Sequence, residues 1–374
     1  MGSRLFSPFS IGRMELSNRI SVAAMCQYSA VEGSMTDWHM QHLGNLALSG
    51  AAMLVIEATG VVPEGRITRH CTGLYSDGNE AAMKRVVSFI RTISPVRVGL
   101  QINHAGRKAS AHRPWEGRGP LAPEEGAWTT VAPSALALAA GWPTPVELDH
   151  AKLDALKAAY VETTRRAARI GVDFIELHST HGYLLSEFLS PLANRRTDEY
   201  GGSLENRMRF PLAVFRAVRD TWPQEKPLGA KISGTDFASG GWTPEDAVAY
   251  ARELKSLGCD YVTVSGGGVV LDAKVPVAPG YQVQYAERVR RKVGITTGSV
   301  GLISSAQQAE DIVSSGKADF VSLARGMLFD PRWPWHAALA LGDDIEYPPQ
   351  YARSHPNSWP GVAEWMAGFT RPTA

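Results

Sequence analysis

The chain has 374 residues, 44% of them hydrophobic and 20% charged, and its 38 basic and 37 acidic side chains give a formal net charge of +1. This is the composition of a globular protein, and no block of like charge predicts a nucleic-acid partner. The apolar runs are too short to predict a membrane span, and the N-terminus lacks the apolar core of a signal peptide. Three cysteines without a CxxC pair predict neither a structural zinc site nor a cysteine-ligated iron–sulfur cluster. We therefore expect a reduced cytoplasmic protein without a bound metal.

Eight short apolar runs recur along the chain and predict eight strands. Runs without polar alternation are typical of strands that are buried on both faces, as in parallel sheets. They cover residues 19–25, 51–58, 96–102, 172–178, 227–233, 260–265, 295–300 and 318–324.

Helical segments separate most of these runs. Residues 153–171 end on Gly171, and residues 203–222 begin with Ser203 as N-cap, with Pro211 expected to kink or break the helix. A third helix has Thr243 as N-cap, Pro244 at its first position and Gly258 as C-cap, and residues 304–316 repeat the pattern. Eight such βα units predict an α/β fold, a (β/α)8 TIM barrel that forms one domain over residues 1–374.

Two segments exceed this pattern. About fifty residues, rich in Gly, Pro and Trp, follow the third strand, and we expect residues 103–150 to form a capping loop, or lid, at the carboxyl end of the barrel. The tail 348–374 is either a loose end or an arm that reaches a partner subunit.

Polar and reactive side chains follow most of the strands, where the active sites of barrels are built. The loops after strands seven and eight commonly bind phosphate, and glycines with Arg325 there predict a phosphorylated ligand. The candidates are Met25, Cys26, Gln27 and Tyr28 after strand one, Gln101, His104, Arg107 and Lys108 at strand three, His178, His181 and Tyr183 after strand four, Lys231 in strand five, and Gly298, Gly301, Arg325 and Gly326 at strands seven and eight.

Four stretches of the sequence resemble the old yellow enzyme family of flavin-dependent ene-reductases, over roughly residues 4–353. HSTHGYLLSEFLSPLANRRTDEYGGSLENRMRF (178–210) and SLARGMLFDP (322–331) look like the family's central signature and its phosphate-binding end. MCQYSAVEG (25–33) and QINHAGRKAS (101–110) resemble the branch of thermophilic-like ene-reductases and xenobiotic reductases.

The resemblance implies non-covalent FMN, NADPH or NADH as transient hydride donor, and an electron-poor alkene as acceptor. Lys231 stands where the family usually has arginine; the lysine keeps the positive charge but lacks the planar, forked guanidinium. Ala324 replaces a frequent glycine. By position, the residues implied to bind FMN are Ala24, Met25, Cys26, Ala58, Gln101, His178, Lys231, Val300, Gly301, Ala324 and Arg325.

The resemblance also implies roles in the reaction. His178 and His181 would donate hydrogen bonds to the substrate oxygen while hydride passes from flavin N5, and Tyr183 would protonate the α carbon. Tyr28 would contact the substrate, and Arg353 would enter the neighbouring subunit's active site, which predicts a homodimer or a larger oligomer. No GxGxxG follows a strand, so we expect the nicotinamide to use the substrate's place.

Three other interpretations stay open at this point. His178 and His181 are also compatible with capping backbone carbonyls, or with binding zinc beside His104 as in barrel hydrolases, although neither an HxH strand end nor an acidic ligand set accompanies them. A non-enzymatic barrel could store or sense FMN. Cys26 alone reads as a small buried hydrophobic residue. The related branch that reduces dienoyl thioesters is disfavoured, since the cluster cysteines and a second domain are missing.

Overall fold

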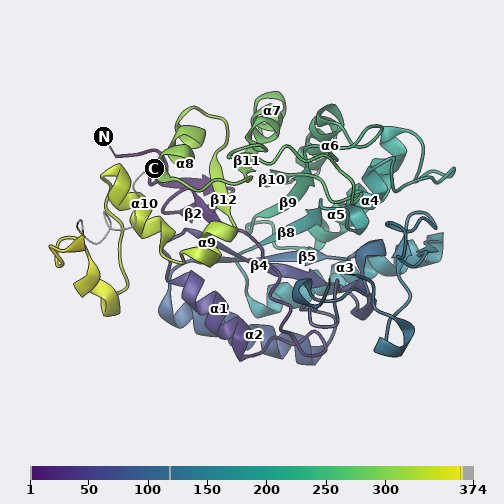
Figure 1. The fold of residues 1–374 in the computed structure, drawn as a ribbon, viewed down its shortest axis with the longest axis horizontal. Coiled ribbons are helices and arrows are strands. Elements are labelled where there is room, and N and C mark those ends of the chain that lie inside the picture. Colours follow the sequence, from purple (N-terminus) through teal and green to yellow (C-terminus); the bar gives the residue numbers. More distant parts are fainter. Residues whose placement is uncertain (1, 118, 363, 365–374) are drawn as a thin grey trace.

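The computed structural model describes residues 2–117, 119–362 and 364, and its centre is a closed barrel of eight parallel strands (Figure 1). All eight predicted strands and the (β/α)8 TIM barrel are confirmed. Each strand pairs with the next along the chain, and β12 closes the ring on β3. The strands are β3 (Ile20–Val22), β4 (Met53–Gly60), β5 (Arg97–Asn103), β8 (Phe174–Ser179), β9 (Leu228–Ser233), β10 (Tyr261–Ser265), β11 (Thr296–Ser299) and β12 (Phe320–Leu323).

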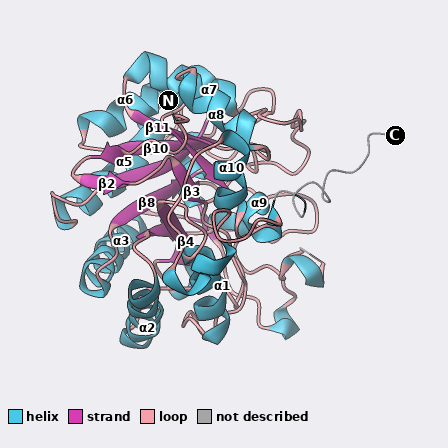
Figure 2. Ribbon diagram, turned by 90° about the vertical axis from the view of Figure 1, so that its left-hand side faces the viewer, coloured by secondary structure: helices cyan, strands magenta, loops and turns pink. Residues whose placement is uncertain are grey.

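Helices follow the strands and cover the outside of the barrel (Figure 2). Ser203 and Thr243 cap their helices through side-chain oxygens, as predicted, and Gly171 ends its helix in the left-handed region. The helices are α1 (Asp37–Ala47), α2 (Asp77–Ile93), α3 (His150–Ile170), α4 (Leu184–Leu189), α5 (Leu204–Thr221), α6 (Pro244–Ser256), α7 (Val283–Val293), α8 (Ala306–Ser314), α9 (Arg325–Phe329) and α10 (Trp333–Leu341).

Two helix predictions need correction. The break expected at Pro211 does not occur, because α5 runs without interruption from Leu204 to Thr221, while the alternative of a kink stays a prediction. Proline lacks a backbone N–H, but the buried side chains on both sides of it hold the helix together. The C-cap of α6 is Leu257, one residue earlier than the predicted Gly258, which follows it with φ 83°.

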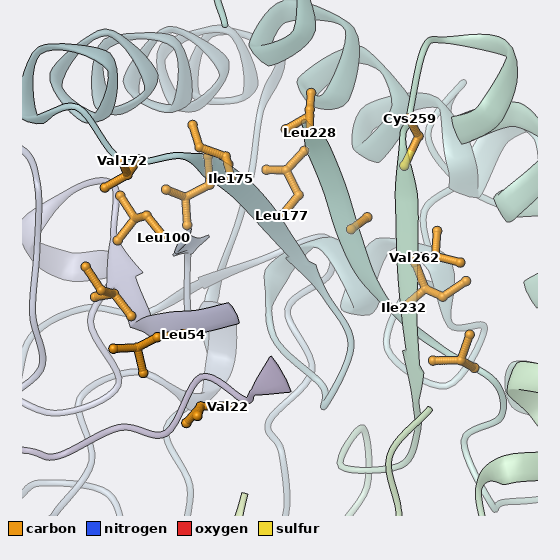
Figure 3. Packing of buried hydrophobic residues seen from close by; sticks show 14 of the residues in the cluster. Val22, Leu54, Leu100, Val172, Ile175, Leu177, Leu228, Ile232, Cys259 and Val262 are labelled. Atoms are coloured by element: carbon orange, nitrogen blue, oxygen red, sulfur yellow. The ribbon is translucent and has the colours of Figure 1, made fainter. Parts of the chain in front are cut away.

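The main hydrophobic core lies between the strands and the surrounding helices. Val22, Leu54, Leu100, Ile175 and Val262 are fully buried there (Figure 3). Each such side chain stabilises the fold by about 1.5–3 kcal/mol relative to leaving it exposed. This outer core holds the eight strands in register and so fixes where their carboxyl ends lie.

A second, smaller core fills the amino-terminal end of the barrel. The hairpin of β1 (Phe9–Ile11) and β2 (Met14–Leu16) packs there with the rings of Phe174, Tyr261 and Phe320. Each ring lies beside a glycine of the preceding strand, and a Cβ at Gly99 or Gly229 would meet the Phe174 or Tyr261 ring at 2.1 or 2.2 Å. Paired glycine and aromatic residues therefore fill the amino-terminal end of the barrel, so a functional site is expected at the carboxyl end.

The long segment after β5 is organised by short elements. It holds three 3-10 helices, η2 (Gly106–Lys108), η3 (Pro114–Glu116) and η4 (Pro123–Glu125), and a small sheet of β6 (Val131–Ala132) and β7 (Val146–Glu147); η1 (Pro63–Gly65) lies after β4. Trp115 contacts Tyr28 edge-on at 5.8 Å between ring centroids. The segment thus reaches the carboxyl end of the barrel, and its action as a lid stays a prediction.

The carboxyl-terminal segment packs on α10, on the side of the molecule opposite the segment after β5 (Figure 1). Tyr347 stacks on Trp335 at 3.9 Å, and Tyr351 in η5 (Pro349–Ser354) meets the same ring at 5.9 Å. Most of the unassigned end of the tail, residues 363 and 365–374, lies outside the described residues. Within the described part of the chain, no helix has the length and apolar character needed to cross a bilayer.

Candidate functional site

The two histidines and the tyrosine that follow β8 come together at the carboxyl end of the barrel. His178 is buried and is the last residue but one of β8, while His181 and Tyr183 are partly exposed in the loop before α4. The His178 ring lies 5.2 Å from the His181 ring and 4.9 Å from the Tyr183 ring, with interplanar angles of 76° and 87°. The structure thus brings these three candidate side chains together, and their roles in the reaction stay a prediction.

The loop that carries His181 has an unusual backbone, held in place from two sides. His181 has φ 63°, a conformation that costs a non-glycine residue about 1–3 kcal/mol and persists only where the surrounding structure imposes it. Gly182 has φ 71°, and a Cβ there would lie 2.1 Å from the Gly268 carbonyl oxygen. Lys108 Nζ donates to the carbonyls of His181 at 2.7 Å and Gly268 at 3.0 Å. The ammonium therefore clamps the loop after β8 to the loop after β10.

Burial keeps both imidazoles neutral. It lowers the pKa of His178 and of His181 well below the ordinary value, and the positive charges of Lys231 and Lys108 lower both further. His181 Nε2 lies 2.8 Å from Ser265 Oγ, whereas His178 Nδ1 is buried and has no partner among the described residues. An unpartnered buried nitrogen of this kind fits a site whose ligand supplies the hydrogen bond.

Tyr183 stays a phenol. Burial raises its pKa well above the ordinary value, and Cys26 and Tyr28 act in the same direction. Lys108 Nζ lies 5.0 Å from the centre of its ring. The cluster therefore combines two neutral nitrogen heterocycles with a protonated hydroxyl, which can donate hydrogen bonds and a proton.

A polar floor lies below the cluster, on β5, β8, β9 and β10. Gln101 Nε2 donates to Glu176 at 2.7 Å, and Thr263 Oγ1 donates to the other carboxylate oxygen at 2.9 Å. Lys231, in register with His178, is buried, and its ammonium forms no hydrogen bond or ion pair with the described residues. Burial lowers the pKa of Lys231, and the charge of Glu176 opposes this. An uncommitted buried cation fits an anionic group on a ligand.

Glu176 is a site residue that the sequence did not single out. It lies within an apolar run, and only the strand pairing reveals that it faces Gln101 and Thr263. Lys108, a candidate from the sequence at strand three, lies at the site, where its Nζ contacts the Tyr183 ring and the His181 carbonyl.

The loop after β3 forms a further wall. Ala24, Met25, Cys26 and Tyr28 are all partly exposed there, and Ala58 lies on the neighbouring strand β4. A hydrogen bond with Cys71 and burial raise the pKa of the Cys26 thiol well above its ordinary value. Cys71 lies 45 positions away from Cys26 in the sequence, and the fold brings the two thiols side by side.

The residues predicted to hold a phosphate lie on adjacent strand ends. Val300 and Gly301 follow β11, and Ala324 and Arg325 follow β12, its neighbour in the barrel. Gly301 has φ 112°. Arg325 is exposed, and it makes no hydrogen bond or ion pair with the part of the chain that the structure describes. The uncommitted guanidinium beside glycine-rich backbone is a suitable phosphate partner.

Comparison with known proteins decides the family. A family model described as "NADH:flavin oxidoreductase / NADH oxidase family" matches residues 4–343. The chain belongs to this family, which includes the old yellow enzymes. An NADPH dehydrogenase of Geobacillus thermodenitrificans (strain NG80-2) is 42% identical over 355 residues, which cover 94% of this chain and 99% of the relative.

Solved structures agree with this assignment. Morphinone reductase superposes with a TM-score of 0.76 at 26% identity, covering 94% of this chain and 93% of that one. A 2-naphthoyl-CoA reductase complex gives a TM-score of 0.82 at 22% identity, which shows the fold alone, and the match spans 53% of that longer chain. For a member of the old yellow enzyme family, the predicted cofactors, FMN and a nicotinamide dinucleotide, are confirmed.

The site residues fit FMN. Lys231 in β9 and Arg325 after β12 are cations without a hydrogen bond or ion pair among the described residues, and His178 Nδ1 lacks a partner there. Cations at these two points suit an electron-rich ring system and a phosphate, respectively.

The zinc alternative lacks its ligands. Over the residues described, the one group of three potential ligands with metal-site spacing is His150, Asp198 and Glu199, at the start of α3. It does not include the histidines after β8, and Asp198 is already engaged by Arg196. His104 points elsewhere: its Nδ1 accepts a hydrogen bond from the Gly106 N–H at 3.0 Å.

Proposed function

We propose that this protein is an FMN-dependent ene-reductase that uses NADPH or NADH to reduce the C=C bond of α,β-unsaturated carbonyl or nitro compounds. The observation that carries the proposal is the cluster of His178, His181 and Tyr183, with neutral imidazoles and a protonated phenol at the carboxyl end of the barrel.

The chain's own residues hold the cofactor. Arg325 with the backbone at Val300, Gly301 and Ala324 would bind the phosphate, and Lys231 would face the pyrimidine side of the ring, together with Gln101 and Ala58. When bound and reduced by NADPH or NADH, FMN would supply the hydride that adds to the β carbon of the alkene. Ala24, Met25 and Cys26 would line the ring from the loop after β3.

The imidazoles polarise the substrate. When hydride adds to the β carbon, negative charge builds on the carbonyl or nitro oxygen, and donors from His178 and His181 stabilise it. One donor aimed at developing charge is worth about 10²–10³ in rate. Because both rings are neutral, they donate without adding a fixed charge, and the His181 bond to Ser265 orients one of them.

Tyr183 supplies the proton. Its hydroxyl remains protonated because burial raises its pKa, so it can deliver a proton to the α carbon as charge leaves the oxygen. Tyr28 would close the substrate side of the pocket, where Trp115 contacts its ring.

The nicotinamide would occupy the same place as the alkene. No GxGxxG motif follows a strand, so the chain offers no separate dinucleotide fold. The two substrates would therefore alternate, which predicts ping-pong kinetics.

A second subunit would complete the site. Arg353 lies in η5 and is exposed in the isolated chain. We propose that it reaches the active site of a neighbouring copy in a homodimer or larger oligomer.

The visible spectrum and one anaerobic titration test the proposal. The purified protein should be yellow, NADPH should bleach it, and cyclohexenone should restore the colour. Bleaching without alkene-driven reoxidation would favour an FMN-storing protein, and a colourless protein that binds no FMN would contradict both.

A further inference from the structure

A buried histidine–carboxylate pair lies behind residues 25–28, the loop that carries Cys26 and Tyr28. His39 on α1 is 1% exposed and Glu57 on β4 is 3% exposed, and His39 Nε2 lies 2.9 Å from Glu57 Oε1. A buried ionisable pair is costly to the fold unless its hydrogen bonds are complete, and its benefit is commonly a specific geometry. The mechanism above uses neither residue.

The hydrogen bonds around His39 determine which of its ring nitrogens donates to Glu57. The Thr36 N–H donates to His39 Nδ1 at 3.0 Å, so Nδ1 is the acceptor of the ring and Nε2 carries the proton. Nε2 therefore donates to Glu57 Oε1. The other oxygen, Oε2, accepts a hydrogen bond from the backbone N–H of Gln27. An unbroken chain of bonds thus runs from the first turn of α1 to the loop after β3.

Glu57 can reach Gln27 because its strand is irregular at this point. The pairing of β4 with β5 shifts register between Ile56 and Thr59, which is the signature of a β-bulge. Bulges beside active sites commonly re-aim a side chain. The irregularity thus places a carboxylate behind the loop instead of another apolar side chain.

The loop needs external support. Tyr28 has φ 51°, which is unfavourable for a bulky side chain, and surrounding contacts must impose it. Gln27 is held on both sides, since its Nε2 donates to the Met25 carbonyl at 2.9 Å and Trp38 Nε1 donates to its Oε1 at 3.1 Å. The bond from the Gln27 N–H to Glu57 ties this backbone to strand β4 of the barrel.

We propose that His39 and Glu57 are positioning residues for the reaction, which hold residues 25–28 so that Cys26 and Tyr28 face the flavin and the substrate. The inference rests on the proposed function for its kinetic consequence, but the position of Cys26 is measurable without any turnover. The carboxylate also adds negative charge beside the Cys26 thiol and so helps to keep it protonated.

Four variants of the full-length holoenzyme separate positioning from stability. Glu57→Gln keeps the volume but turns an amide NH2 towards the His39 Nε2–H or the Gln27 N–H, so one of the two bonds is lost. His39→Leu removes the donor, and His39→Gln restores an amide donor at a similar reach. Asp173→Asn is the matched control, because Asp173 accepts from the Val98 N–H at 2.8 Å at the opposite end of the barrel.

The first measurement is the rate at which iodoacetamide alkylates Cys26 at neutral pH, followed by mass spectrometry of the Cys26 peptide. Cys259 is buried, follows α6 away from this loop, and serves as the internal reference. We expect Glu57→Gln to accelerate the alkylation up to about tenfold, since it removes the negative charge beside the thiol and a change of one pKa unit changes the thiolate fraction tenfold. His39→Leu keeps that carboxylate, so the acceleration that we also expect in this variant reports the released position of residues 25–28. His39→Gln and Asp173→Asn should stay near the wild-type rate.

The second measurement is the alkene KM, with bound flavin and melting temperature recorded for each variant. Glu57→Gln and His39→Leu should raise KM about fivefold, the equivalent of one net hydrogen bond, with the flavin content kept. If these two variants lose thermal stability but match Asp173→Asn in both KM and Cys26 alkylation, the pair is only structural and the proposal is overturned. If neither the wild type nor any variant reduces an alkene, the proposed function fails. The Cys26 alkylation rates would then still test whether His39 and Glu57 position residues 25–28.

Discussion

Replacing Tyr183 by phenylalanine isolates proton delivery from every other part of the site. The Tyr183 hydroxyl forms no hydrogen bond with the described residues, and the ring contacts with His178 at 4.9 Å and Lys108 at 5.0 Å remain in the variant. The free energy of unfolding should therefore change by no more than about 0.5 kcal/mol. A placed general acid contributes about 10²–10⁴ in rate, which corresponds to about 2.7–5.5 kcal/mol of barrier.

Stopped-flow spectroscopy without oxygen measures the two half-reactions separately. The rate of bleaching by NADPH should stay within about twofold of wild type, whereas reoxidation by cyclohexenone should slow by about 10²-fold or more, less any proton that solvent supplies. Tyr160→Phe is the matched control, because the Tyr160 hydroxyl likewise has no hydrogen-bond partner among the described residues but lies on α3, away from the site. Equal slowing of both half-reactions in Tyr183→Phe would refute the acid role.

Four further predictions address the rest of the site. Arg325→Ala should weaken FMN binding about 10- to 100-fold by loss of a charge-assisted contact, measured by flavin fluorescence on dilution. Arg252 is an exposed arginine that serves as control, and an equal loss of affinity in Arg252→Ala would contradict the phosphate role of Arg325. Lys108→Met should leave two carbonyls unpaired, lower the free energy of unfolding by about 1–3 kcal/mol and slow alkene reduction; unchanged urea unfolding would speak against the clamp. Burial lowers the pKa of His104 to about 4 from 6.5, so between these pH values the unfolded chain binds more protons than the folded one. The free energy of unfolding should therefore fall as the pH drops through this window, by about 3 kcal/mol from this residue. A His104→Asn variant whose free energy of unfolding, measured in urea, has the same pH dependence as that of the wild type would disprove the assignment. Arg353→Ala should raise the alkene KM without changing the melting temperature, and wild-type steady-state kinetics with every alkene would remove the subunit-crossing role.

The barrel was predictable because its strands carry a strong local signal. Parallel strands buried on both faces read as uninterrupted apolar runs, and the caps Ser203 and Thr243 mark helix starts by chemistry that acts within three residues. Pro211 shows the limit of local rules, because packing over the whole of α5 outweighs one missing hydrogen bond.

The site was predictable where its residues follow strands, and not where they meet through the fold. His178, His181 and Tyr183 are neighbours in sequence, so their cluster needs only one strand end. Glu176 reads as part of an apolar run, and Cys71 as an isolated buried thiol. Both gain their meaning from partners on other strands and loops, which no local pattern reveals.

The most direct test of the central claim is a crystal structure of the protein with FMN and an unreactive carbonyl or phenol ligand. The account predicts the flavin across the carboxyl ends of the strands, the ligand oxygen within hydrogen-bonding distance of both His178 and His181, and the Tyr183 hydroxyl on the ligand face away from the flavin. Imidazoles that face away from the ligand oxygen, or a flavin bound elsewhere, would contradict it.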